Sequence, residues 1–498
     1  MWGWKLAWSL AVTLAPGAIA AQVIAVRTVP VPRDHQFDRF PSLSAAMGGV
    51  SVAAEDSLLD PFRNPARGSR VAGARIFAAA GFYRVTQATG NGTTLPLGVI
   101  GRVGPWFGGL AYAMQDVDID DGFGLPPVAP CPACAARGIT LSEPARPRGN
   151  DYFTGFLGRR FPEAGLAVGL GVAASDLTWV HGTELLYAGS ARVQQRGAGL
   201  DLRLGATKEW GPRTLDAVLV HNRYSGSHDV VFLDQIWDPG TTQTILRPRL
   251  EANLDRTNTW GGHLQYRQPL RARGWQIGAV ATVNVLSHPK IPNYVIQNIP
   301  RDPGNSAAFN FGVGLWKRAA LSEVAMEVLL EPIRSHTWGE ADSALSTAAG
   351  GLIPAGGKTV DNRFRFGNAI VRFGAAQRFP FGEHADALTF RLGLGAHRIR
   401  YALEQRDLVA GTRRRADHGW TEWTPTWGVS FRLDGVELHY RGRASGTDLG
   451  AMFAFGGRGD DVTVVDPGPG VVAAPAGPLF MNGLRVTTHQ FSISVPIR

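Results

Sequence analysis

Long stretches of the chain alternate between apolar positions and small or polar positions. From Leu166 to Ala174 every second residue is apolar, and glycine, alanine or another small residue stands between them. The same alternation recurs at 200–207, 275–285, 388–397, 436–443 and 490–497. A period of two is typical of β-strands that have one apolar face. The pattern therefore predicts an all-β protein.

Strand length separates a soluble sheet from a membrane-spanning one. A soluble β-sandwich also alternates, with its apolar face turned toward a core, but its strands are mostly about 5–6 residues long. The segments here reach about ten residues, which matches the ~9–11 residues that a tilted strand needs to cross a bilayer. We therefore expect a transmembrane antiparallel β-barrel.

The connections between the predicted strands alternate between short and long. Tight turns are expected at 104–105, 162–165, 211–213, 271–274, 319–322, 380–386 and 433–435. Longer polar stretches lie near 119–150, 181–190, 231–255, 287–305, 336–360, 403–417 and 446–483. Bacterial outer-membrane barrels have short turns on the periplasmic side and long loops outside. With a first outer loop near 87–93 the count is 16 strands, and one hairpin miscounted gives 14 or 18; we expect 14–16.

Aromatic residues stand near the ends of several predicted strands. Interfacial girdles of aromatic rings are a feature of transmembrane barrels. The residues that fit such girdles are Trp106, Tyr152, Trp260, Trp275, Trp420, Trp423 and Trp427.

The N-terminus predicts export from the cytoplasm. Lys5 precedes an apolar run at 6–15, and Ala18-Ile19-Ala20 provides the small residues that a signal peptidase accepts. A short membrane anchor is the alternative, but the run is shorter than the ~20 residues of a spanning helix. We expect a signal peptide at 1–21.

A motif precedes the first predicted strand, which we place at about Val71. Met47-Gly48-Gly49 is followed by Asp56-Ser57 and then by Asn64-Pro65-Ala66. This segment resembles the N-terminal signature of the FadL superfamily of outer-membrane barrels, over about 25 residues. That superfamily includes transporters of long-chain fatty acids and aromatic hydrocarbons, and PorV-type barrels of a secretion system. The sequence departs from it at Arg67, where glycine is usual, and at its last residue, which is not aromatic.

The resemblance implies a plug, an N-terminal segment that closes the pore. It implies a linker at 22–41, the plug at 42–70 and the barrel at 71–498. Small residues and the helix-ending Asn64-Pro65 step suit a segment folded inside a lumen; a periplasmic linker is the alternative. The plug or gating residues are Met47, Gly48, Gly49, Asp56, Asn64 and Pro65, and the plug is expected to move around its two glycines.

Composition narrows the possible functions. Glycine supplies 62 of the 498 residues, which argues against a helix-rich protein. The net charge is +9, but only five of the 50 basic residues are lysine. A genome rich in G and C produces the same arginine bias, so no nucleic-acid partner is expected.

The predicted strand phase turns a set of arginines inward, because charges on the lipid face cost ~2–4 kcal/mol at the midplane. The set consists of Arg203, Arg267, Arg391, Arg432, Arg441 and Arg443. Inside the lumen these guanidinium groups could clamp an anionic ligand. The alternative is that they pair with Asp201, Glu327, Glu331 and Glu437 to fill a blocked lumen.

Other chemical motifs predict no enzyme, no metal and no cofactor. Ser227-His228-Asp229 cannot form a triad, because neighbouring side chains on a strand point to opposite faces. The acidic run 116–122 departs from an EF-hand in its glycine and glutamate positions, which leaves at most a weak calcium site in an outer loop. Cys131 and Cys134 suit a small disulfide ring better than an incomplete zinc site.

We therefore expect an outer-membrane channel for passive uptake of hydrophobic or amphipathic small molecules, fatty-acid-like or aromatic, gated by the plug. Its expected partners are outer-membrane lipid and a hydrophobic or anionic small ligand. Two alternatives stay open. One is a PorV-like scaffold that holds a secreted protein without transporting it, and the other is a general porin.

Overall fold

The computed structural model describes most of the chain from residue 35 onward. The described residues are 35–85, 90–118, 132–136, 148–180, 190–272, 274–288, 291–293, 299–301, 303–341, 343–381, 387–433, 435–447 and 485–497. The expected signal peptide lies outside them. Among the described residues, no helix has the length and apolar character needed to span a membrane.

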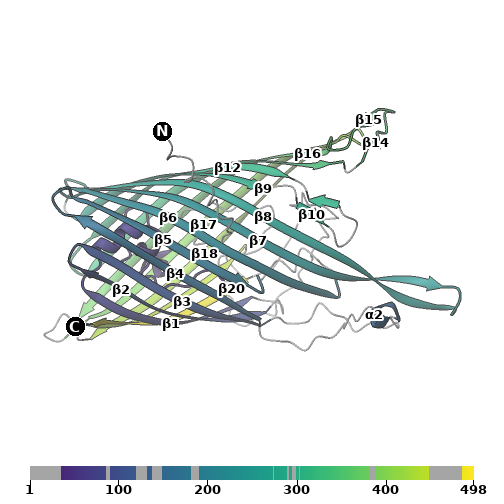
Figure 1. Cartoon of the computed structure of the whole chain (residues 1–498). Helices are drawn as coiled ribbons and strands as arrows, with labels where there is room; N and C mark the ends of the chain where they lie inside the picture. The colour runs from purple at the N-terminus through teal and green to yellow at the C-terminus, as the bar shows by residue number, and fades with distance from the viewer. Residues whose placement is uncertain are drawn as a thin grey trace, which may run out of the picture.

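Sixteen antiparallel strands form a closed barrel (Figure 1). They are β1 (Ala74–Val85), β2 (Asn91–Val103), β3 (Trp106–Asp118), β4 (Arg148–Phe161), β5 (Leu166–Leu177), β6 (Arg192–Trp210), β7 (Arg213–Asp238), β8 (Gln243–Pro269), β9 (Trp275–His288), β12 (Gly304–Arg318), β13 (Ser322–Glu340), β16 (Lys358–Pro380), β17 (Ala387–Asp407), β18 (Thr412–Leu433), β19 (Val436–Gly446) and β20 (Arg485–Ile497). The expected range of 14–16 strands is confirmed at its upper end. β1 closes the barrel by pairing with β20, from Ala74 opposite Ile497 to Val85 opposite Val486.

Short elements lie outside this ladder. Two small hairpins, β10–β11 (Ile291–Asn293, Ile299–Arg301) and β14–β15 (Leu345–Ser346, Leu352–Ile353), and the helix α2 (Pro132–Ala136) belong to the connections. The 3-10 helices η1 (Ser44–Met47) and η2 (Pro65–Arg70) and the helical turn α1 (Asp60–Arg63) belong to the N-terminal segment. These three N-terminal elements lie within the barrel, near the end that carries the short turns (Figure 1).

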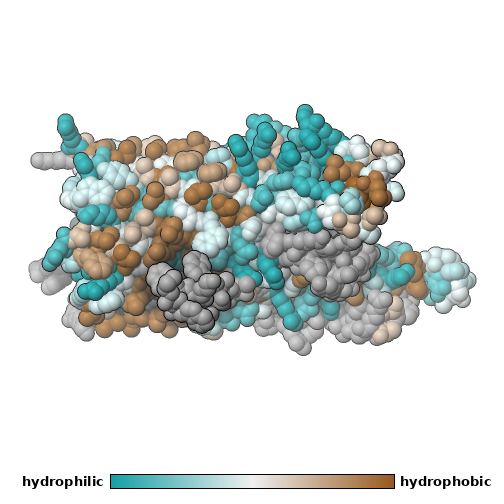
Figure 2. All heavy atoms as spheres, turned by 45° about the horizontal axis from the view of Figure 1, so that its top comes forward, coloured by the Kyte–Doolittle hydropathy of each residue, from teal (hydrophilic) through white to brown (hydrophobic). Residues whose placement is uncertain are grey.

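The wall has an apolar outer face and a small or polar inner face. On β5, Leu170 points outward and is 62% exposed, and on β17 Leu392 is 66% exposed. Arg203, which stands between two outward leucines on β6, is 2% exposed and faces the lumen. Figure 2 shows the resulting belt of hydrophobic residues around one part of the barrel. A closed barrel satisfies every backbone group of the wall and its apolar belt faces lipid, so the fold is that of a transmembrane barrel.

The strand alternation decides whether each predicted girdle residue faces the lipid or the lumen. The side chains of Trp106 and Trp260 point outward, and their exposed fractions are 50% and 64%. Tyr152 is instead buried in the lumen, where its hydroxyl donates to Gln115 at 2.9 Å. Trp420 also faces inward, in an apolar cluster. The girdle prediction was wrong for these two residues, because position near a strand end does not determine the face.

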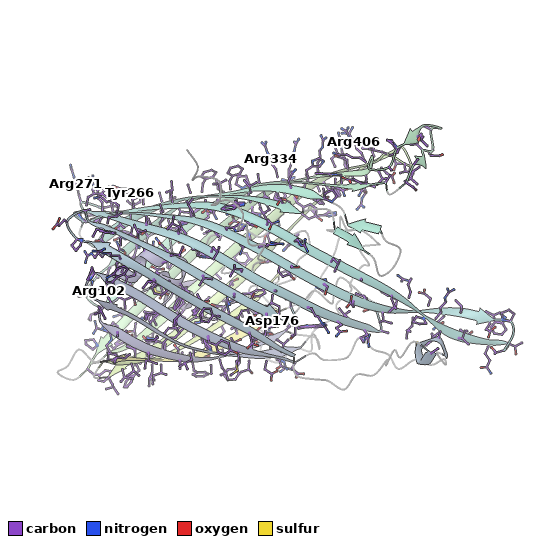
Figure 3. All side chains as sticks on the ribbon, in the orientation of Figure 1. Arg102, Asp176, Tyr266, Arg271, Arg334 and Arg406 are labelled. Atoms are coloured by element: carbon purple, nitrogen blue, oxygen red, sulfur yellow. The ribbon has the colours of Figure 1, made fainter. Side chains whose placement is uncertain are left out.

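One hairpin extends beyond the rim. β6 pairs with β7 only as far as Val231, and β9 pairs with β8 only from Asn258 onward. Among the described residues, the segment 232–257 of β7 and β8 therefore pairs in the barrel ladder only with itself, and it projects from the long-loop end in Figures 1 and 3. We call it the projecting hairpin.

Candidate functional site

The segment 42–70, which we call the plug, rests on inward-facing glycines of the wall. Its role in closing the pore stays a prediction. η1 lies against β16, β17 and β18. A Cβ atom added at Gly393 would lie 2.0 Å from the backbone nitrogen of Gly48, and one at Gly374 would lie 2.3 Å from the carbonyl oxygen of Met47. Any side chain at either position would overlap the plug backbone. The glycine content of the strands thus makes room for the N-terminal segment.

The two predicted gating glycines are the turn that follows η1. Gly48 and Gly49 have φ angles of +73° and +75°, which favour glycine. The N–H of Gly48 donates to Thr426 on β18 at 2.8 Å. Beside them Met47 is buried against Ala325 and Ala376 of the wall. In this structure the turn is held tightly to the wall, and its role as a hinge stays a prediction.

Replacing Gly393 with alanine is expected to unseat η1, because the new methyl group overlaps the backbone of Gly48. Limited proteolysis of the folded barrel should then cleave the plug segment at least several-fold faster. The matched control is Gly262→Ala on the lipid face, where a Cβ has only an ordinary contact, 3.7 Å from Val283. Equal cleavage rates for the two variants would contradict this packing.

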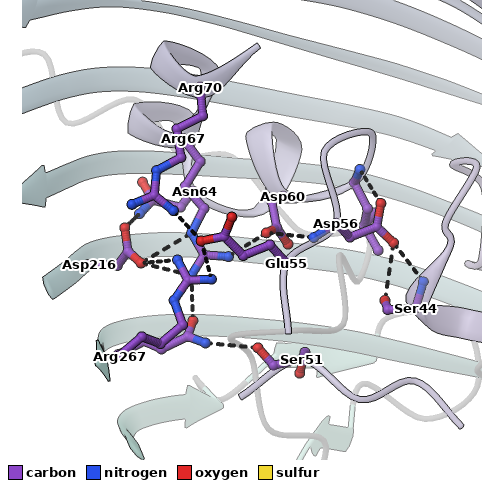
Figure 4. Close-up of polar contacts among 12 residues, drawn as sticks. Ser44, Ser51, Glu55, Asp56, Asp60, Asn64, Arg67, Arg70, Asp216 and Arg267 are labelled. Atoms are coloured by element: carbon purple, nitrogen blue, oxygen red, sulfur yellow. Dashed lines mark hydrogen bonds and ion pairs between the residues drawn. The ribbon is translucent and has the colours of Figure 1, made fainter. Parts of the chain in front are cut away.

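A second anchor is the buried carboxylate of Asp216 on β7 (Figure 4). Its oxygens accept from Arg67 of the plug at 2.8 Å and from Arg267 of β8 at 3.1 Å. Thr207 of β6 donates to it at 2.6 Å, and Asn64 donates at 3.3 Å. Arg67 also pairs with Asp60 of the plug at 2.7 Å. Asp216 therefore ties the plug to three neighbouring strands.

Glu55 extends this network at the edge of the plug. Its carboxylate pairs with Arg267 at 2.9 Å and with Arg70 of the plug. Arg70 in turn donates to Glu209 of β6 at 3.0 Å. Burial by itself would raise the pKa of Glu55, but the neighbouring guanidinium groups outweigh burial and hold this pKa below its ordinary value. Glu55 is therefore ionised in the seated plug.

Two predicted plug residues organise the plug itself. Asp56 accepts hydrogen bonds from Ser42 at 2.7 Å and from the N–H of Ser44 at 3.0 Å, so it joins η1 to the following loop. Asn64 caps η2, since its side-chain oxygen accepts from the N–H of Ala66 at 3.1 Å. Pro65 follows at the first position of η2, against the wall glycines Gly169 and Gly205.

Sequence reasoning missed Glu327 of β13 as a plug contact. The N–H groups of Ser51 and Val52 both donate to Glu327 at 2.8 Å. Arg372 of β16 donates to its other oxygen at 2.7 Å. The available signal was an inward acidic residue with apolar residues on both sides of it in the sequence, a position where a buried charge needs a partner. The same signal marks Asp216.

Five of the six predicted lumen arginines are paired with acidic side chains, and four of these five do not line the cavity described below. Arg203 pairs with Asp201 at 2.5 Å and donates to the carbonyl of Arg63 at 2.9 Å. Arg267 pairs with Asp216 and Glu55, as described. Arg441 lies 2.9 Å from Asp38, and Arg443 lies 3.8 Å from it. The pairing alternative thus describes these arginines better than a ligand clamp.

The other two arginines line a cavity between the plug and the short turns. This cavity has a volume of about 420 Å³. Arg391 donates to Ser430 at 2.6 Å, and Arg432 pairs with Glu437 at 2.5 Å. Their ligand-binding role stays a prediction, and both border this cavity.

An apolar cluster faces the lumen on the long-loop side of the plug. Its members are Leu286, Ala308, Ile333, Phe364, Phe366, Tyr401 and Leu403, with Ala416 and Trp420 packed against them. They alternate along the strands with lipid-facing residues such as Leu330 and Val371, so they face inward. The rings of Phe366 and Tyr401 lie 5.5 Å apart. This cluster was not predicted from the sequence, although the alternation places its aromatic residues on the inward side.

The other chemical candidates form no site within the part of the chain that the structure describes. Ser227, His228 and Asp229 are consecutive on β7. No group of three or more possible metal ligands occurs among the described residues. Cys134 is disulfide-bonded, whereas Cys131 and most of the acidic run at 116–122 lie outside the described residues.

No protein-family model matches the chain, and no curated protein sequence matches it. It is similar to a solved FadL homologue of Pseudomonas aeruginosa, with a TM-score of 0.42, 13% identity, and coverage of 94% of this chain and 98% of that chain.

The toluene transporter TbuX of Ralstonia pickettii gives a TM-score of 0.40, 12% identity and coverage of 92% and 97%. A bacterial polysaccharide outer membrane secretin gives a TM-score of 0.39, 7% identity, and coverage of 86% of this chain and 99% of that chain. Structural similarity at these TM-scores and identities does not indicate which molecules this barrel binds. By its own architecture the molecule is a bacterial outer-membrane β-barrel, and the structures similar to it include the FadL type that the N-terminal motif led us to expect.

Proposed function

We propose that this barrel is a passive channel for hydrophobic or amphipathic small molecules across the outer membrane. The observation that carries the proposal is the apolar cluster around Phe366 and Tyr401 inside the lumen. A water-filled pore is lined by polar residues, whereas a group of inward-facing apolar and aromatic side chains suits a ligand that leaves water. We infer no enzymatic activity.

The plug supports gated passage and not free diffusion. Its ion pairs with Asp216 and Arg267 and its backbone hydrogen bonds to Glu327 hold it in the lumen near the short turns. A ligand held by the apolar cluster would have to pass this obstruction, so movement of the plug is part of the proposed mechanism. The cavity lined by Arg391 and Arg432 lies on the far side, where a carboxylate could be received by a guanidinium group.

Replacing Phe366 and Tyr401 with glutamine tests the proposal. The parent protein in detergent should bind the fluorescent fatty acid cis-parinaric acid, and the double variant should bind it at least about tenfold more weakly, because two apolar contact surfaces are lost. Titration of fluorescence measures the affinity. Trp237→Gln at the tip of the projecting hairpin serves as the control, since Trp237 is a comparably large apolar side chain far from the cluster.

Heat-modifiable gel mobility verifies that each variant is a folded barrel. Equal affinity of the folded double variant and the parent would reject the cluster as a binding site. Conductance that is insensitive to added fatty acid in the parent would instead favour a general porin.

The projecting hairpin favours one second function, a scaffold for a secreted protein. In the part of the chain that the structure describes, segment 232–257 pairs with no other barrel strand, and Ile236 and Trp237 near its tip are 37% and 63% exposed. An exposed apolar tip on an extended hairpin is a feature of protein-binding surfaces. A scaffold would carry a stable protein partner through purification in detergent, and would lose it when the tip is removed.

A further inference from the structure

The outer surface of four adjacent strands carries a dense group of cations. These strands are β13, β16, β17 and β18. The exposed arginines on their outward face are Arg334, Arg363, Arg365, Arg398, Arg400, Arg406, Arg413 and Arg415. Four acidic residues, Glu340, Asp361, Glu404 and Asp417, share this face with the eight arginines. The surface is therefore strongly positive. We call it the arginine face.

The arginine face begins where the apolar belt ends. On β13 the outward residue Leu330 is 55% exposed, and Arg334 follows four residues later on the same side. On β16 the outward Val371 precedes Arg365 in the direction of the long loops. Figure 2 shows hydrophilic residues replacing the hydrophobic belt toward this end, and Figure 3 shows Arg334 and Arg406 along the outer edge. The cations thus lie at the level of lipid headgroups in the outer leaflet.

The centre of the arginine face brings like charges together. Arg334 on β13 stands directly opposite Arg365 on β16. Like charges opposite each other on one face of a sheet destabilise it. Among the described residues, no acidic side chain forms an ion pair with either of them, whereas Arg400 pairs with Asp417 at 2.8 Å. An anion from outside the chain would relieve this repulsion.

Space for that anion exists beside the pair. Gly367 lies on the outward side, two residues from Arg365 and opposite Pro332 of β13, where the β16–β17 ladder is interrupted between Phe366–Tyr401 and Ala369–Arg398. A Cβ atom added at Gly367 would meet nothing within 4 Å. The outward neighbour Ala402 is also small, and it stands opposite Arg365. Gly367 and Ala402 thus form a patch of small residues on the outer surface, which we call the opening, bordered by guanidinium groups and continuous with the lipid-facing belt.

We propose that the arginine face binds the phosphate groups of a phosphorylated lipid in the outer leaflet. The phosphate lies over Gly367, between Arg334, Arg365 and Arg400, and the acyl chains lie against the belt below. Guanidinium groups bind phosphate with paired, charge-assisted hydrogen bonds. A lipid fits better than a soluble anion, because only a lipid satisfies the cations and the adjoining apolar surface together. This site is independent of any transported ligand.

Native mass spectrometry of the intact protein in non-ionic detergent tests the proposal, with dioleoyl phosphatidic acid as the probe and dioleoylglycerol as its phosphate-free counterpart. The parent should bind phosphatidic acid, and Arg334→Gln/Arg365→Gln should bind it about tenfold or more weakly. The control Arg213→Gln/Arg271→Gln removes two exposed arginines at the short-turn end and should bind as the parent does.

A second variant, Gly367→Leu, fills the opening but keeps every arginine, and it should also weaken binding of phosphatidic acid. Equal losses in the control and the Arg334/Arg365 variant would overturn the proposal, as would equal binding of dioleoylglycerol. Displacement of phosphatidic acid by millimolar inorganic phosphate would show a site for free anions in place of a lipid site. Because Arg334→Gln/Arg365→Gln removes a repulsion, the variant is expected to fold.

Discussion

Deletion of residues 42–70 is expected to leave a folded barrel with a much larger conductance. The barrel closes through β1 and β20 without the plug, so the wall keeps its hydrogen bonds. The plug fills the lumen through contacts with Thr426, Glu327 and Asp216. Its removal leaves these inward polar groups in water and opens a path. Single-channel recording in planar bilayers should show conductance rising several-fold over the parent.

The matched control shortens the chain elsewhere. Residues 234–247 of the projecting hairpin can be replaced by Asn-Gly, because Leu233 and Pro248 are already opposite each other and a two-residue turn joins such a pair. This variant should conduct as the parent does. Unchanged conductance of the folded plug deletion would show that the lumen is closed by another part of the chain, and the plug assignment would fail.

Replacing Asp216 with leucine is expected to release the plug without deleting it. Arg67 and Arg267, which are nearly inaccessible to solvent, would lose a shared carboxylate. Removing one member of a buried ion pair costs about 3–5 kcal/mol, because the remaining charge is uncompensated. The seated state should therefore lose roughly a hundredfold or more in population relative to released states. Protease cleavage within 42–70 and the frequency of channel openings measure this release.

Asp234→Leu is the control for this substitution. Asp234 pairs with Arg249 on the projecting hairpin, with both side chains about half exposed. Exposed ion pairs contribute only about 0–1 kcal/mol, so the plug should stay protected. Protection of the plug in Asp216→Leu equal to that in Asp234→Leu would reject Asp216 as its main anchor.

The sequence predicted which side chains face the lumen, but it did not predict which of them contact one another. Arg203 and Arg267 were expected inside the barrel, and both are there. Their interaction partners could not be predicted, because residues that meet inside the lumen are far apart in the sequence, as Arg67 and Asp216 are. Tyr152 and Trp420 were assigned to the membrane interface from their position near strand ends, yet the register of each strand turns them inward. The apolar cluster around Phe366 joins six strands, and no local pattern groups them.

The sequence by itself determined the two faces of each strand, the length of the strands and the alternation of short and long connections. These features depend on the two-residue period and on the thickness of a bilayer, which act locally. Tertiary structure alone decided how the lumen is filled. Gly393 lies against Gly48, Asp216 lies against Arg67, and Arg334 lies opposite Arg365, because barrel closure and strand register bring distant residues within a few ångströms of each other.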